Sequence, residues 1–184
     1  MIAPHSTLAN AANFVLFQLV WFACVMGAAA GRPWLGPLAV AAWLALHAFW
    51  PGRPRELKLV LAVTLIGTAV DSALRAVGLL GYSAVPGGWP TFVAPPWIIA
   101  LWAAFAALLR HSLAWLTPRP WLGAAFGAIG GPLSFLAGRR LGAVELHAER
   151  PALSLVALAL EWAILTPALG LLARRGSNPP TLSK

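Results

Sequence analysis

The sequence predicts an all-α, polytopic membrane protein, folded as a compact bundle of six transmembrane helices. Of its 184 residues, 60% are hydrophobic and only 10% are charged, and the mean hydropathy is +0.77, values that favour a membrane over water. Apolar stretches of about twenty residues recur, the length with which a helix crosses roughly 30 Å of hydrocarbon. Because these stretches lack the alternation of barrel strands, their backbone polar groups must be satisfied within helices.

We expect the apolar stretches to form a single domain over residues 1–173. No lysine or arginine precedes the first stretch, as a secretory signal would require, so we expect it to be a retained span. In the fourth stretch, Pro95 and Pro96 predict a late start near Trp97 and hence a short helix. Residues 174–184, RRGSNPPTLSK, predict a disordered cytoplasmic tail. The expected spans are residues 13–31, 34–50, 59–80, 91–109, 121–138 and 152–172.

The positive residues predict the orientation of these spans. With the N-terminus inside, the inner segments carry about twice as many lysines and arginines as the outer ones. We therefore expect both termini to be cytoplasmic, in a bacterial inner membrane, although Arg139 and Arg140 favour the opposite orientation. The net charge of +8 fits loops that face anionic lipid, and no basic stripe indicates nucleic-acid binding. The uncharged segment YSAVPGGWPTFVAPP is predicted to lie on the membrane surface or to fold back over the bundle.

Small residues mark two faces of the fifth span. One face carries Gly123, Gly127 and Gly131, and the adjacent face carries Gly130, Ser134, Gly138 and Gly142. Such faces allow close helix packing, and the first face could also contact another membrane protein. Pro132 predicts a bend in this span, where freed carbonyls or Ser134 could line a small polar cavity.

Three charged residues lie inside otherwise apolar spans: Asp71 and Arg75 share a helix face in the third span, and Glu161 lies at about the same depth in the sixth. An isolated charge at mid-membrane costs at least about 2.5 to 3.5 kcal/mol, so each should find a partner, face the interior or stay neutral. In one interpretation Asp71 and Arg75 neutralise each other, and an uncharged Glu161 locks the helices together. In the other, the three form a catalytic site in which Asp71 stays ionised and Glu161 donates a proton. An oligomer interface is a third interpretation.

Other polar residues give weaker signals. Ser134, Gln18 and His47 are candidates for contact with a substrate, although Gln18 also fits helix packing and His47 fits a place at the membrane interface. Glu145, His147 and Glu149 alternate along an expected loop, a spacing that matches no known metal motif. We expect no metal and no cofactor, since no phosphate-binding, dinucleotide-binding or hydrolase motif is present.

Several segments together resemble a known family over nearly the full length of the chain. They are NFVLFQLVWFACVMGAA, GRPWLGP, LKLVLAVTLIGTAVDS, APPWIIALWAAFAALLRHSL and GGPLSFLAGRRLGAV. This succession resembles a family of small bacterial inner-membrane proteins catalogued as domain of unknown function 2878. The resemblance implies no established activity. It implies a link to lipid modification, through genes for cyclopropane-fatty-acid-synthase-like and short-chain-dehydrogenase-like enzymes near those of its members, which is an association and not a mechanism.

Three classes of function stay open from the sequence. The first is a lipid-related membrane enzyme or accessory subunit that acts on a membrane lipid, with Glu161 as proton donor and Asp71 and Arg75 as positioning groups. The second is a small proton-linked carrier that uses the same carboxyl groups. The third is a non-catalytic membrane scaffold, in which the glycine-rich span contacts another protein. The family resemblance slightly favours the lipid-related role, and whether the protein is an enzyme stays open.

Overall fold

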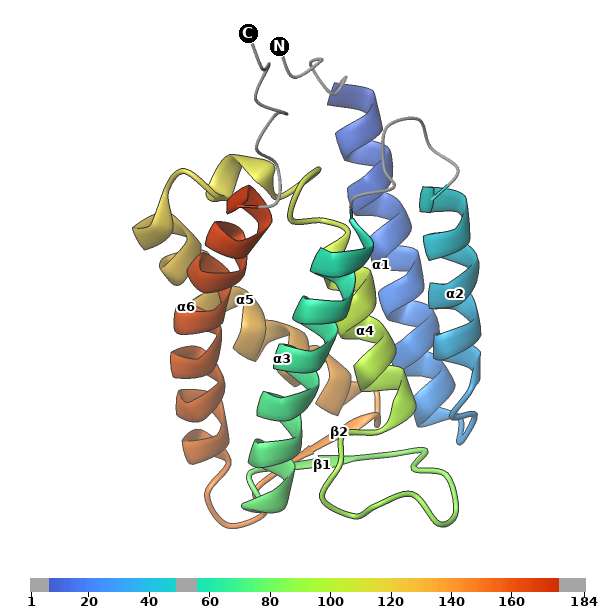
Figure 1. The fold of residues 1–184 in the computed structure, drawn as a ribbon. Helices are drawn as coiled ribbons and strands as arrows, with labels where there is room; N and C mark the ends of the chain where they lie inside the picture. Colours follow the sequence, from blue (N-terminus) through green and yellow to red (C-terminus); the bar gives the residue numbers. More distant parts are fainter. Residues whose placement is uncertain (1–6, 49–55, 176–184) are drawn as a thin grey trace, which may run out of the picture.

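The structure, a computed structural model, describes residues 7–48 and 56–175. Within these residues the chain forms six α-helices, one short 3-10 helix and two short strands (Figure 1). The helices are α1 (Thr7–Ala29), α2 (Leu35–Ala48), α3 (Leu57–Ala76), α4 (Pro96–Ala106), α5 (Pro120–Arg140) and α6 (Pro151–Arg175). The 3-10 helix η1 is Ala114–Leu116, and the strands are β1 (Leu80–Tyr82) and β2 (Val144–Leu146). The predicted helical class is confirmed for the described part of the chain.

Four of the helices, α1, α3, α5 and α6, are long and apolar enough to cross a membrane. The other two are shorter, with 14 residues in α2 and 11 in α4. At 1.5 Å per residue they are about 21 and 17 Å long, less than the roughly 30 Å of a hydrocarbon core. The expectation of six full spans is therefore supported for four helices and not confirmed for the other two. The short α4 begins at Pro96, as the proline pair predicts.

Local sequence signals set several helix ends. Three helices are followed by a glycine with positive φ, namely Gly31, Gly78 and Gly142. In each case the next N–H donates to a carbonyl five residues earlier, a hydrogen bond that closes the helix end. Prolines occupy the first position of α4, α5 and α6, where their fixed φ suits a helix and their missing N–H costs nothing.

A two-stranded antiparallel sheet, formed by β1 and β2, joins the loop after α3 to the loop after α5. In it Leu80 pairs with Leu146 and Tyr82 with Val144, and these four side chains are buried. This sheet lies at the end of the bundle away from the first turn of α1 and the last turn of α6, which we call the sheet end (Figure 1). No local pattern in the sequence predicts this pairing, which brings Tyr82 to the end of α3.

The helices pack in an antiparallel arrangement. Helices α1, α2 and α3 all pack on α4, while α5 and α6 form a close pair. Their close approach depends on glycine, because a Cβ atom at Gly127 would lie 2.1 Å from the carbonyl oxygen of Trp162, and one at Gly131 would lie 2.3 Å from its ring. The Gly123, Gly127 and Gly131 face, which could also have contacted another membrane protein, is thus covered by α6 of the same chain.

The outward faces of the long helices are apolar and exposed. Leu65 on α3 is 70% exposed and Ile164 on α6 is 66% exposed. Such a surface would be unstable against water over its whole circumference, whereas it matches hydrocarbon. In the described residues, the packed interior and the apolar outer surface are therefore those of a helical membrane protein.

Candidate functional site

Asp71 is the best-defined polar centre within the bundle. Its side chain is 1% exposed and accepts two hydrogen bonds, from the Tyr82 hydroxyl at 2.8 Å and from Trp102 Nε1 at 2.5 Å. Strand β1 supplies Tyr82 and α4 supplies Trp102. Gly67, one turn before Asp71, leaves room for the indole, since a Cβ atom there would lie 1.9 Å from Trp102 Cδ2. The three elements thus fix this carboxyl group from two sides.

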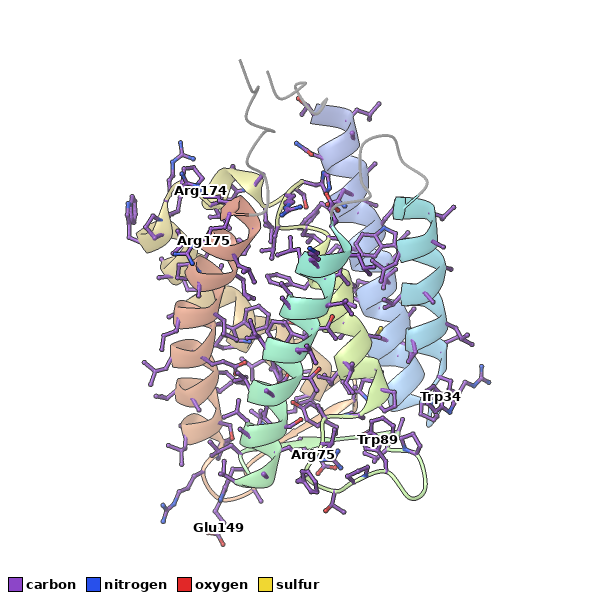
Figure 2. All side chains as sticks on the ribbon, viewed as in Figure 1. Trp34, Arg75, Trp89, Glu149, Arg174 and Arg175 are labelled. Carbon is purple, nitrogen blue, oxygen red and sulfur yellow. The ribbon has the colours of Figure 1, made fainter. Side chains whose placement is uncertain are left out.

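Arg75 does not pair with Asp71. Its Nη1 donates to the carbonyl of Val93, and among the described residues the two side chains form no salt bridge. The N–H of Ala94 donates to Ser72 Oγ at 2.9 Å, and Trp97 Nε1 donates to the carbonyl of Ser83 at 3.0 Å. Arg75 and Trp89 both lie at the end of the molecule that carries the two-stranded sheet (Figure 2). The segment before α4 therefore folds back over the end of α3, one of its two predicted placements.

Glu161 lies on α6 with both carboxyl oxygens buried. Neither oxygen has a hydrogen-bond partner among residues 7–48 and 56–175. The charge of Asp71 acts on this carboxyl group, so the two acidic side chains lie within electrostatic range of each other. Glu161 thus differs from Asp71, because hydrogen bonds saturate one and leave the other unpaired.

Tyr82 reports on all three charged residues. Burial raises the pKa of its hydroxyl well above the usual value, and the charge of Asp71 and the hydrogen bond donated to it act in the same direction. The charge of Glu161 also raises this pKa, whereas Arg75 lowers it. One phenol therefore lies within electrostatic range of every residue that the sequence predicts for the catalytic site.

Aromatic rings connect Asp71 to the pair α5 and α6. Trp102 stacks on Trp162 with ring centroids 5.0 Å apart and an angle of 12° between the rings. Phe105 meets the edge of Trp162 at 5.3 Å. The ring of Trp162 rests against Gly131. A continuous aromatic contact thus leads from the acidic centre on α3 to the glycine face of α5.

A cleft with a volume of about 390 Å³ lies between α1, α4, α5 and α6, within the range of small-molecule sites. Phenylalanine, leucine and tryptophan side chains form its walls together with Gly127, Gly130 and Gly131, and of these glycines Gly130 leaves open space. A smaller cavity of about 70 Å³ shares Trp162 and Ser134 with the cleft and reaches Asp71 and Trp102. The cleft and the acidic centre are therefore neighbours.

The weaker predicted residues fall in different places. Ser134 accepts a hydrogen bond from Trp21 Nε1 at 3.1 Å and, like Gln18, lines the cleft. His47 lies in the last turn of α2, but its side chain is outside the described residues. The structure thus brings Ser134 and Gln18 to one cleft and Asp71, Arg75 and Glu161 to one neighbouring region.

Other polar contacts hold the opposite end of the bundle. Asn13 of α1 donates to the carbonyl of Ala107 at 3.4 Å and accepts from Ser112 Oγ at 2.8 Å, the cross-helix bonding that a polar residue in a span predicts. His111 Nε2 lies 2.9 Å from Glu56 Oε1. In the described part of the chain, no three His, Cys, Asp or Glu side chains gather as a metal would require.

Comparison with known proteins identifies the family. The sequence model of the family described as protein of unknown function (DUF2878) matches residues 10–168. The chain belongs to the DUF2878 family. No curated protein and no solved structure matches it. The DUF2878 match covers most of α1, all of α2 to α5 and most of α6, so it includes Asp71, Glu161 and the whole cleft.

Several residues around the acidic centre and the cleft were not predicted from the sequence. Trp102, Trp162 and Thr166 line the cavities or hold Asp71, yet each occurs in an apolar stretch that offers no sign of its direction. One signal was available. Trp102 and Trp162 fall in the middle of their spans, away from the membrane interface that tryptophans prefer.

Proposed function

We propose that the protein binds the acyl chain of a membrane lipid in the cleft between α1, α4, α5 and α6, and serves as a lipid-related membrane enzyme or as an accessory subunit of one. The observation that carries this proposal is the cleft itself, which is apolar, lies among membrane-spanning helices and adjoins a buried acidic centre. A cleft of this character in a water-soluble protein would suit any apolar ligand. Between helices surrounded by hydrocarbon, acyl chains are the most abundant candidates.

The acidic centre supplies the groups that could take part in a reaction at this site. Asp71 accepts two hydrogen bonds and so suits a fixed, positioning role, while Glu161 has no such partner among the described residues. An unpaired carboxyl group at membrane depth is more stable as the neutral acid, which can donate a proton. Glu161 is therefore our candidate proton donor, with Asp71 and Arg75 holding the surrounding structure.

One observation also favours the second candidate, a small proton-linked carrier. Two carboxyl groups within electrostatic range, of which one lacks a partner, could load and release a proton. The scaffold role receives less support, because α6 covers the glycine face that would have bound another protein.

We propose that the protein lies in the bacterial inner membrane, with the start of α1 and the end of α6 on the cytoplasmic side. The first turn of α1 and the last turn of α6 lie at one end (Figure 1), and that end carries Arg174 and Arg175 (Figure 2). Positive residues favour the cytoplasmic side.

Filling the cleft tests the binding proposal directly. At Gly130 an added Cβ would meet only Phe126, at 3.9 Å, so a larger side chain can enter the cleft without separating helices. We expect Gly130→Leu to lose lipid that co-purifies with the wild type, measured by native mass spectrometry, and Gly130→Ala to keep it. Equal lipid content in all three proteins would refute the proposal.

The lipid-related role is tested in cells. We expect the mass-spectrometric lipid profile of a deletion strain to differ from wild type, and Glu161→Gln to fail to restore it. Glu149→Gln is the matched control, since Glu149 is exposed at the sheet end, away from the cleft (Figure 2). An unchanged profile together with a lost pH-dependent flux would favour the carrier instead.

A further inference from the structure

Four arginines gather around the last turn of α6, at the end of the bundle opposite the sheet end. Arg110 Nε donates to a carbonyl of that turn at 3.0 Å, and Arg174 Nη1 donates to the carbonyl of Thr117 at 3.5 Å. Arg119 follows Thr117 by two residues, and Arg175 is the last residue of α6. We call Arg110, Arg119, Arg174 and Arg175 the arginine cluster.

Little negative charge offsets this cluster. All five aspartate and glutamate side chains of the sequence lie in the described residues, and only Glu56 is at this end of the bundle. The carboxylate of Glu56 lies 2.9 Å from His111 Nε2. Arg119 and Arg175 are exposed, and neither forms a salt bridge within residues 7–48 and 56–175. A concentration of positive charge of this kind attracts anions.

The sheet end differs in this respect, although it also carries arginines. Arg139 and Arg140 end α5 there, close to Ala137, which lines the cleft. The exposed carboxyl groups of Glu145 and Glu149 share that end of the molecule and offset part of its positive charge. Of the two ends, the arginine cluster is therefore the better site for an anion.

A chain of contacts joins the arginine cluster to the cleft. Arg119 Nη1 donates to the carbonyl of Trp115 at 3.1 Å. The Trp115 ring meets the ring of Phe126 at 81°, with centroids 6.3 Å apart, and Phe126 lines the cleft. Trp115 is 48% exposed, as is common for tryptophans at the membrane interface. The cluster and the cleft thus adjoin through one interfacial tryptophan.

The depths of the two sites fit one lipid molecule. Arg119 directly precedes α5, and Phe126 is six residues beyond its first residue, Pro120, hence roughly 9 Å deeper. Lipid headgroups lie at the edges of the hydrocarbon core. A phosphate held at Arg119 therefore leaves the glycerol and the acyl chain to continue toward the cleft. A free phosphate ion would make no use of the apolar walls.

We propose that the acyl chain in the cleft belongs to an anionic phospholipid, whose headgroup phosphate binds the arginine cluster chiefly through Arg119. This inference rests on the proposed acyl-chain binding and names the class of lipid. A guanidinium group offers five N–H donors, so Arg119 can keep its bond to Trp115 and still bind a phosphate. The remaining positive charge of the cluster favours a headgroup with a net negative charge over a zwitterionic one.

The test compares phosphatidylglycerol with phosphatidylcholine of identical acyl chains. Each lipid is titrated into delipidated full-length protein in detergent, and bound lipid is measured by native mass spectrometry. We expect phosphatidylglycerol to bind about tenfold more tightly. Arg119→Gln should reduce this preference by about fivefold, the effect of one basic residue near an anionic headgroup. Arg119→Lys keeps the charge and should keep most of the preference.

Two further variants separate the headgroup from the chain. Arg140→Gln makes the same change of charge at the opposite end of α5, and should leave the preference intact. Gly130→Leu fills the cleft and should weaken both lipids alike, with the preference unchanged. An excess of inorganic phosphate should not displace phosphatidylglycerol, because the acyl chain supplies part of the binding.

The outcomes distinguish this inference from the proposed function. If neither lipid binds, acyl-chain binding itself is wrong. If both lipids bind equally, or if Arg119→Gln leaves the preference unchanged, acyl-chain binding stands and the proposed headgroup site is overturned. A larger loss in Arg140→Gln than in Arg119→Gln, or displacement by inorganic phosphate, would overturn it as well.

Discussion

Asp71 shows how a membrane protein keeps a carboxyl group in its interior. Two donors from different elements, Tyr82 and Trp102, hold its oxygens, so the group needs no cation. Arg75, four residues away, is instead used at the end of the helix, where it binds a loop carbonyl. At the residue scale, hydrogen bonds replace the ion pair that the sequence spacing suggested as one interpretation.

Replacing Asp71 tests this arrangement. Asparagine has one acceptor oxygen in place of two and would turn its NH2 group toward a donor. We expect Asp71→Asn to lower the free energy of unfolding by about 1 to 3 kcal/mol, measured by denaturant titration in detergent. Tyr82→Phe, which removes one donor, should cost less. Full stability of Asp71→Asn would mean that these hydrogen bonds do not form.

The single tyrosine of the chain offers a spectroscopic test of the whole acidic region. Because the pKa of Tyr82 is raised in the folded protein, its stabilising contribution is complete below the unfolded pKa of about 10 and is lost as the pH rises above it. We expect the tyrosinate absorbance of folded protein to appear at higher pH than that of denatured protein. Tyr82→Phe should remove the matching loss of stability.

Charge variants sharpen the same titration. Asp71→Asn should lower the pKa of Tyr82 the most, Glu161→Gln should lower it less, and Arg75→Ala should raise it, following the order of the charges that act on the phenol. If Glu161→Gln leaves the titration unchanged, Glu161 lies too far away to share the region, and its proposed role with Asp71 is lost.

At the scale of elements, glycine decides which helices can touch. Gly127 and Gly131 bring α5 against α6, and Gly67 brings α3 against Trp102 of α4. Between helices in a membrane there is no hydrophobic gain from association, so close backbone approach and van der Waals contact must supply it. The glycine spacing in the fifth span predicted such an approach, and α6 is the helix that makes it.

Alanine substitutions along α5 test this packing. At Gly127 the new Cβ would meet the backbone of α6 at 2.1 Å, which a side-chain rotation cannot relieve. We expect Gly127→Ala to destabilise the protein by about 1 to 3 kcal/mol, measured by thermal or denaturant unfolding in detergent. Gly130→Ala, whose Cβ has space, is the control on the same helix. Equal stability of both variants would contradict the packing described for α5 and α6.

For the whole molecule, we expect the two ends of the bundle to lie on opposite sides of a membrane, because four of the helices are long and apolar enough to cross it. Glu149 lies at the sheet end and Arg175 lies at the opposite end (Figure 2). We expect Glu149→Cys and Arg175→Cys to react with a membrane-impermeant maleimide from opposite faces of sealed vesicles. The single natural cysteine, Cys24, is buried, so the unmodified protein should label little and provides the background. Labelling of both positions from one face would rule out this arrangement.

The sequence by itself determined the helical membrane class, the short α4 after its proline pair and the existence of a tightly packed face on α5. Each of these depends on local chemistry, such as the missing N–H of Pro96 or the missing side chain of Gly127, and acts whatever surrounds it. The similar depth of Asp71 and Glu161 is also a prediction from the sequence, because depth follows from counting residues along a helix.

Only the tertiary structure decided which groups meet. Helices that are apolar on every side carry no pattern to show which face turns inward, so neither the contact of Trp102 with Asp71 nor the place of Trp162 and Thr166 in the cleft could be predicted. The pairing of β1 with β2 joins segments more than sixty residues apart, and no local signal specifies it. Depth was fixed by the chain, whereas direction was fixed by the packing of one helix on another.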